Sequence, residues 1–129
     1  MKTLFIAFFC LCSGLPLIAQ KQACQNIHEG SFRLVDKLSG TTVIQRTKTL
    51  QIEENASMGV KMIFDLTWVD DCTYELRAKE VVKGDQSMMG NKGDVITVKI
   101  KEVRANSYIA VTTANFAPLV LEKEIEILK

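Results

Sequence analysis

Apolar and polar residues alternate along most of the chain after residue 29. The alternation is clearest at positions 60–68, where Val60, Met62, Phe64, Leu66 and Trp68 are separated by mainly polar residues. A second alternating run occupies residues 72–79, after a short turn-like stretch with two adjacent acids. Alternation with a period of two is typical of a β-strand with one buried face. We therefore expect two long antiparallel strands joined by a tight turn.

Weaker alternation predicts six further strands around 32–34, 42–44, 50–52, 96–101, 108–113 and 119–127. In the third strand of the chain the apolar positions are Leu50 and Ile52. Residues 83–93, with three glycines and two adjacent methionines, break the pattern and are expected to form a loop or a single helical turn. Successive antiparallel strands can close on themselves and so remove their exposed edges. We expect an all-β domain, a single antiparallel up-and-down barrel of about eight strands; a two-sheet β-sandwich is the alternative.

The first twenty residues predict an export signal. A lysine at position 2 precedes an apolar run at 4–11, and the small residue Ala19 follows a glycine and a proline. The run has the length of a signal peptide and is short for a bilayer span. We expect cleavage after Ala19 or Gln20, with a membrane anchor as the alternative. Cleavage would leave an N-terminal segment, 21–29, and a barrel domain, 30–128, in the periplasm or the medium.

The cysteines support an exported protein with one disulfide. Cys10 and Cys12 lie in the predicted signal, so Cys24 and Cys72 remain as an even pair. Oxidising compartments favour pairing of such cysteines, although two free thiols are the alternative. A bridge between them would tie the N-terminal segment to the sheet and stabilise the fold by about 4 kcal/mol in the chain-entropy treatment.

Composition and length exclude several classes of protein. The 129 residues include 16 Lys and Arg against 15 Asp and Glu, and removal of Lys2 with the signal makes the balance neutral. A neutral chain lacks the basic surface that nucleic acids or anionic membranes select, so we expect no nucleic-acid partner. We also expect no stable membrane span after signal cleavage. The chain is too short for a TIM barrel or a doubly wound dinucleotide-binding enzyme.

No arrangement of residues predicts catalysis. His28 is the only histidine, and no serine or cysteine motif accompanies it. Asp70 and Asp71 are expected to form a turn rather than a calcium site. The glycine-rich stretch 90–93 lacks the ending of a phosphate-binding loop. We expect a protein that is not an enzyme, with no catalytic residues, no metal site and no cofactor.

The long hairpin carries a distinctive local pattern at 62–76, MIFDLTWVDDCTYEL. A strand ends in Trp68, two acids form the turn, and a Cys-x-Tyr-x-Leu run follows. Together with the export signal and the eight expected strands, this pattern resembles the small secreted lipocalin-like, or calycin-like, β-barrel proteins of Gram-negative bacteria, which are mostly uncharacterised. The resemblance covers roughly residues 24–128. Gly30, Ser31 and Phe32 stand where lipocalins carry Gly-x-Trp.

The expected function is a non-enzymatic binding module for a small apolar or amphipathic ligand in the barrel mouth. Two charged residues occupy positions that the alternation assigns to the inner face of the barrel. Glu102 continues the apolar run that ends at Ile100, and Lys123 lies between two apolar positions of the last strand. A buried charge needs water, a partner or a ligand, so these residues are candidate polar anchors, with Lys123 meeting an acidic head group. Location at the barrel rim, with the head groups in water, is the alternative.

The remaining candidate ligand contacts are apolar. We expect Met62, Phe64, Trp68 and Tyr74 to form the walls and Met88 and Met89 an adaptable lid. Alternatively, these side chains fill the barrel, and the protein is a structural or protein-interaction module without a ligand. Apolar side chains on the outer face would then mark the partner surface, and the expected ones are Ile63, Val95, Val103 and Val120.

Overall fold

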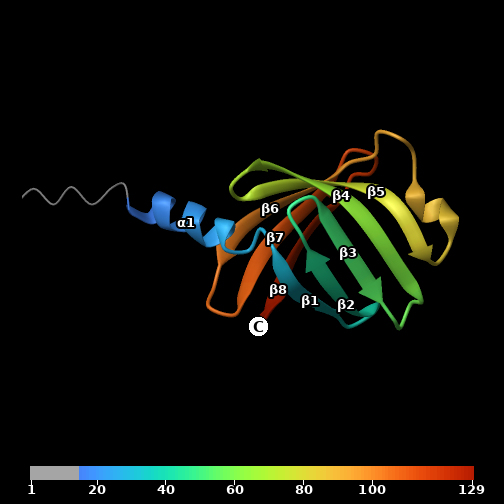
Figure 1. Cartoon of the computed structure of the whole chain (residues 1–129), viewed down its shortest axis with the longest axis horizontal. Coiled ribbons are helices and arrows are strands. Elements are labelled where there is room, and N and C mark those ends of the chain that lie inside the picture. Colours follow the sequence, from blue (N-terminus) through green and yellow to red (C-terminus); the bar gives the residue numbers. More distant parts are fainter. Residues whose placement is uncertain (1–14) are drawn as a thin grey trace, which may run out of the picture.

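A computed structural model describes residues 15–129 of the chain. The predicted signal peptide, residues 1–20, lies mostly outside the described residues, as do Cys10 and Cys12. Figure 1 shows a barrel with one helix, α1, projecting from one end.

Within the described residues, eight strands follow one another around a closed barrel (Figure 1). They are β1 (Gly30–Asp36), β2 (Gly40–Arg46), β3 (Leu50–Asn55), β4 (Val60–Asp70), β5 (Thr73–Lys83), β6 (Ile96–Val103), β7 (Ser107–Ala114) and β8 (Val120–Leu128). The helical elements are α1 (Leu15–Gln25) and the short 3-10 helix η1 (Gln86–Met89). Each strand pairs antiparallel with the next, and β8 returns to pair with β1. The prediction of a single antiparallel up-and-down barrel is confirmed, and the sandwich alternative is excluded.

The two ends of the barrel differ. At the end that we call the closed end, the turns 47–49, 71–72 and 104–106 lie near α1, on the left of Figure 1. At the other end, which we call the open end, lie the turns 37–39, 56–59 and 115–119 and the longer segment 84–95 with η1. The strongest alternation, at 60–68, faces inward as predicted: Met62, Phe64 and Leu66 are buried.

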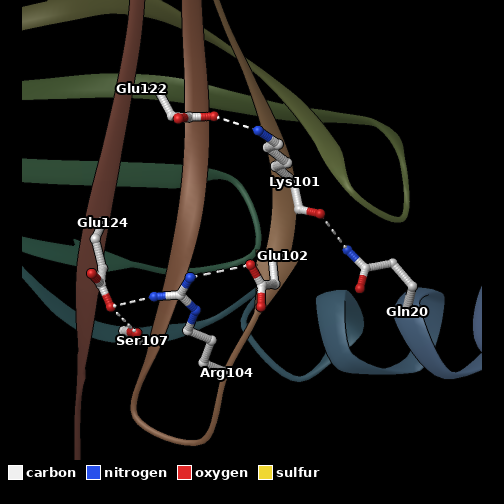
Figure 2. Close-up of polar contacts among 7 residues, drawn as sticks. All are labelled: Gln20, Lys101, Glu102, Arg104, Ser107, Glu122 and Glu124. Carbon is white, nitrogen blue, oxygen red and sulfur yellow. Dashed lines mark hydrogen bonds and ion pairs between the residues drawn. The ribbon is translucent and has the colours of Figure 1, made fainter.

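The N-terminal segment is fixed across the closed end. Cys24, fully buried, forms the predicted disulfide with Cys72, with 5.2 Å between the Cα atoms. Gln25 Nε2 donates a hydrogen bond to Asp71 Oδ1 at 3.0 Å, and Gln20 Nε2 donates to the Lys101 carbonyl at 3.2 Å (Figure 2). Neither described helix has the length and apolar character needed to cross a bilayer.

A β-bulge in β6 reverses the direction of two predicted side chains. Opposite β7, Ile100 pairs with Ala110 but Glu102 pairs with Ile109, so Lys101 is one residue extra. One extra residue changes which positions face inward. Glu102 is therefore exposed and forms an ion pair with Arg104 at 3.3 Å (Figure 2), whereas Val103 packs against the core. The predictions of an inward Glu102 and an outward Val103 are wrong.

Strand β3 also differs from the simple pattern. Its apolar residues Leu50 and Ile52 lie in phase with the outer surface, where Ile52 pairs with Ile63 of β4. Its inward positions are all polar, namely Gln51, Glu53 and Asn55. The inner face of this one strand brings amide and carboxyl groups into a largely apolar barrel.

Candidate functional site

The interior of the closed end is built around one buried cation, Arg46, at the end of β2. Its side chain makes four hydrogen bonds within the described chain. Nε donates to Gln51 Oε1 at 2.9 Å and one terminal nitrogen donates to the Ile27 carbonyl at 2.7 Å. The other donates to the hydroxyls of Tyr74 and Tyr108 at 2.9 and 3.0 Å. Since a guanidinium has five N–H groups, these bonds occupy nearly all of its donors.

Aromatic side chains pack around Arg46. We call Arg46, its partner Gln51 and the rings of Phe32, Tyr74 and Tyr108 the plug of the closed end. The Arg46 guanidinium lies 4.5 Å from the centre of the Phe32 ring, and the Phe32 and Tyr108 rings meet edge to face with centroids 5.5 Å apart. Cation–π contact compensates part of the lost hydration of a buried arginine. Burial raises the pKa of Tyr74 well above its ordinary value, so its phenol is neutral and accepts the arginine hydrogen bond. The plug separates the rest of the interior from the closed end.

Trp68 lies at this end, near the surface. His28 stacks on it, with ring centroids 3.5 Å apart and planes 10° apart. His28 Nε2–H donates to the Asp71 carbonyl at 2.7 Å, which holds the imidazole in place. The Trp68 Nε1 group is buried without a hydrogen-bond partner in the described part of the chain. His28 therefore covers a core aromatic residue, and Trp68 lies at the opposite end of the barrel from Met88 and Met89.

Between the plug and the open end lies a cavity of about 290 Å3. Its apolar walls come from both halves of the barrel, chiefly Leu34, Ile44, Leu76, Ile96, Val98 and Ile125. Its polar lining consists mainly of Asp36, Gln51, Glu53, Tyr74, Thr112 and Lys123. A mostly apolar cavity with a few convergent polar groups is the usual form of a small-molecule site. We take this cavity as the candidate site, although the wider surface hollows beside Trp68 (about 410 Å3) and beside Cys72 (about 480 Å3) are larger. Those hollows lie outside the barrel and lack its apolar enclosure.

Lys123 lies inward at the cavity, as its place in the alternation predicted, but it already has a partner. Its Nζ lies 3.0 Å from Asp36 Oδ2, so the ion pair joins the last strand to the first. Asp36 Oδ1 also accepts the backbone N–H groups of Leu38 and Ser39 at 2.8 and 3.0 Å. The Ser39 N–H group, Lys123 and the Leu38 N–H group, in that order, hold the pKa of Asp36 far below its ordinary value. The pair is a fixed unit without net charge at neutral pH.

Glu53 is the carboxylate at the cavity that has no ionic partner. It lies on β3 opposite Ile44 and Met62, and no ion pair among residues 15–129 includes it. Desolvation raises the pKa of Glu53, against the opposing effects of the Arg46 charge and the Gln51 side chain. The cavity thus contains a carboxyl group that has no cationic side chain paired with it among the described residues.

Two smaller hollows adjoin the cavity at the open end. One, of about 190 Å3, includes Met58 and Met62 and shares Ser39 and Glu53 with the cavity. The other, of about 240 Å3, lies against η1 and shares Leu76 and Ile96 with the cavity. Its further lining includes Phe64, Met88, Met89 and Phe116. These hollows extend the candidate site towards the rim.

The structure brings most of the predicted ligand contacts to one end. Met62, Phe64, Met88, Met89 and Lys123 surround the cavity and its adjoining hollows, and Tyr74 lies at the boundary with the plug. Trp68 and Glu102 lie elsewhere.

Four residues of the interior, Glu53, Arg46, Gln51 and Asp36, were not predicted from the sequence. Strand β4 and the turn that precedes it contain a signal for Glu53. Asn55 pairs with Val60 across that turn, so the inward face of β4 continues onto Asn55, Glu53 and Gln51.

The described residues show no metal-ligating cluster: residues 15–129 contain no group of three or more His, Cys, Asp or Glu side chains placed to hold an ion. Compared with protein-family models, with curated proteins and with solved structures, the chain has no significant match in any of the three.

Proposed function

We propose that the protein is an exported, non-enzymatic, lipocalin-like binding module that holds a small amphipathic ligand in the open end of its barrel. The observation that carries this proposal is the cavity of about 290 Å3, with its apolar walls and the charged groups of Asp36, Lys123 and Glu53. A barrel filled by its own side chains would leave no such space.

The size of the cavity limits the ligand. Its volume equals that of roughly ten water molecules at about 30 Å3 each, so about ten non-hydrogen atoms fit inside. A longer chain would extend into the hollows beside Met62 or Met88. Methionine side chains adapt to different apolar shapes, which suits the mouth of such a site.

Export is part of the proposal and has separate support. The disulfide between Cys24 and Cys72 is compatible with an oxidising compartment, since such bonds are rare in reducing cytosol. The resemblance of the hairpin at 62–76 to small secreted lipocalin-like proteins supports the same location.

The test uses two adjacent threonines of β7 that face opposite ways. Thr112 lines the cavity, whereas Thr113 is exposed on the outer surface. We expect Thr112→Phe to fill the cavity and Thr113→Phe to leave it open. Titrations with hexan-1-ol, hexylamine and hexanoate are followed by NMR of the methionine methyl groups, because the single tryptophan lies at the far end. Mass spectrometry of extracts from the purified protein would then identify the natural ligand.

Binding of at least one of these compounds to the wild type and to Thr113→Phe, with loss in Thr112→Phe, supports the proposal. Absence of binding to the wild type, or equal binding to both variants, contradicts it. Folding of each variant is checked by circular dichroism.

Exposed apolar side chains at the open rim favour a second candidate function, a protein-interaction module. Leu38 is 99% exposed, and Met58 and Phe116 are also exposed, each on a different turn of this end. Of the outer residues expected from the sequence, Val120 is exposed and lies at the same rim, whereas Ile63 and Val95 are partly buried. Exposed apolar side chains that gather at one end of a protein commonly mark an interface. Concentration-dependent self-association in sedimentation velocity, removed by Phe116→Ser, would support this function, and a monomer at all concentrations would count against it.

A further inference from the structure

The charged groups at the cavity are not equally available to a ligand. Lys123 and Asp36 satisfy each other at 3.0 Å, and two backbone N–H groups hold Asp36 in place. Lys123 donates to Asp36 through one of its three N–H groups, so its charge is already balanced, and a second carboxylate beside it would add a net negative charge. Arg46 lies deeper, with its N–H groups directed to Gln51, Ile27 and the two tyrosine hydroxyls. Lys123 is therefore neutralised by Asp36, and Arg46 has nearly all of its donors occupied.

Glu53 is placed differently. It borders both the main cavity and the smaller hollow beside Met62, so a ligand that enters from the open end passes its side chain. Ion pairs of the described residues use neither of its oxygens. Its neighbours on the inner face of β3 are the uncharged Gln51 and Asn55, and across the strands it lies opposite the apolar Ile44 and Met62. A carboxylate in such surroundings gains most from a ligand that brings its own positive charge and N–H donors.

Arg46 provides only part of that compensation. Its charge favours the Glu53 carboxylate, but its four hydrogen bonds go to other groups and no ion pair joins the two side chains. Burial of Glu53 outweighs the effects of the Arg46 charge and the Gln51 side chain, so the pKa of Glu53 is raised. Among residues 15–129 the Gln51 side chain hydrogen-bonds this carboxylate, but no cationic side chain forms an ion pair with it.

We propose that Glu53 receives the head group of the ligand and that the ligand is a small amphipathic amine, with its ammonium group on the Glu53 carboxylate and its apolar part along the cavity wall. This inference rests on the proposed function, and it reverses the expectation that Lys123 meets an acidic head group. The preferred ligand class follows from the order of these charged groups: a neutral pair at the mouth, an acid without an ionic partner inside, and beneath it an arginine whose donors are nearly all occupied.

The test compares three ligands with the same six-carbon chain, hexylamine, hexan-1-ol and hexanoate. Dissociation constants are measured by NMR of the methionine methyl groups for the wild type and for Glu53→Gln, which keeps the shape of the side chain. The matched control is Glu54→Gln. Glu54 is the next residue of β3, on the outer face, with Lys83 3.5 Å away.

We expect the wild type to bind hexylamine at least about tenfold more tightly than hexan-1-ol, as a charge-assisted hydrogen bond in place of a neutral one would give. Hexanoate should bind most weakly. Glu53→Gln should lose the preference for the amine and keep its affinity for hexan-1-ol, whereas Glu54→Gln should behave like the wild type.

The possible results separate this inference from the proposed function. Tightest binding of hexanoate, or a preference for hexylamine that persists in Glu53→Gln, overturns the amine assignment and leaves the cavity as a ligand site. Failure of all three compounds to bind the wild type overturns both. If Glu53→Gln does not fold, the comparison of amine with acid in the wild type still tests the class of ligand, and Glu53→Asp, which keeps the charge but withdraws it by one methylene, then tests the position of the head group.

Discussion

Removal of the Arg46 side chain should destabilise the barrel far more than removal of a surface arginine. In Arg46→Ala, the Tyr74 and Tyr108 hydroxyls can turn towards each other, but the Ile27 carbonyl and the Gln51 amide oxygen lose their donor. Each buried polar group left without a partner costs about 1–3 kcal/mol, so we expect a loss of about 4 kcal/mol.

Arg33→Ala is the matched control. Arg33 binds Glu126 through two nitrogens on the outer surface, with both side chains more than 40% exposed (43% and 45%). Exposed ion pairs contribute at most about 1 kcal/mol, even in good geometry. Arg46→Lys should fall between the two, with a loss of about 2 kcal/mol, because one ammonium group cannot reach all four acceptors.

Urea denaturation followed by Trp68 fluorescence measures these losses, because the Trp68 ring lies 6.0 Å from the Arg46 guanidinium. With a denaturant slope of about 1.5 kcal/mol per molar, the midpoint of Arg46→Ala should fall by roughly 2–3 M. A free energy of unfolding within about 1 kcal/mol of that of Arg33→Ala would refute the assignment of Arg46 as the plug of the closed end.

Three further predictions concern the disulfide, the unpaired acid and the bulge. Replacement of Cys24 and Cys72 together by serine should lower the free energy of unfolding by about 4 kcal/mol, measured by urea denaturation, and the wild type in reductant should match it. Because the folded state raises the pKa of Glu53 above its ordinary value of 4.5, this group favours folding below that value and loses the contribution as the pH rises through the folded-state pKa. Glu53→Gln should therefore melt at a higher temperature than the wild type at pH 8, with the difference gone near pH 4; equal differences at both pH values would contradict this. Val103→Ala should cost about 1 kcal/mol and Glu102→Ala less than about 0.5 kcal/mol in urea denaturation, and the reverse order would show that the bulge is misplaced.

Alternation predicted the barrel because its strongest part is long and regular. Nine positions from Val60 to Trp68 keep one phase, and closure of eight such strands follows from the need to bury that face and remove free edges. The disulfide was predictable from the expected export signal and from the even number of cysteines that follow it. These features depend on the alternation of apolar and polar residues and on the number of cysteines, and both can be read from the sequence.

The candidate site was less predictable because it depends on register. Lys123 was found from its apolar neighbours, but Glu53 was missed because Leu50 and Ile52 made the opposite face of a short strand look buried. The Glu102 prediction failed because a one-residue bulge has no strong mark in the alternation around it. The Arg46 plug needs Ile27, Gln51 and two tyrosines from separate strands, and their meeting is a property of the closed barrel alone.

The first helix and the last strand reach the same end of the barrel, which decides where the protein can be attached to a surface or a label. Helix α1 reaches the barrel beside the disulfide, and Leu128, which pairs with Ser31, ends the last strand on the same side (Figure 1). A tag, dye or solid support joined at the start of α1 or after Leu128 would thus lie at the closed end and leave the open end facing the solution. If the proposed ligand enters at the open end, protein immobilised through α1 and protein immobilised through its last strand should bind it equally well.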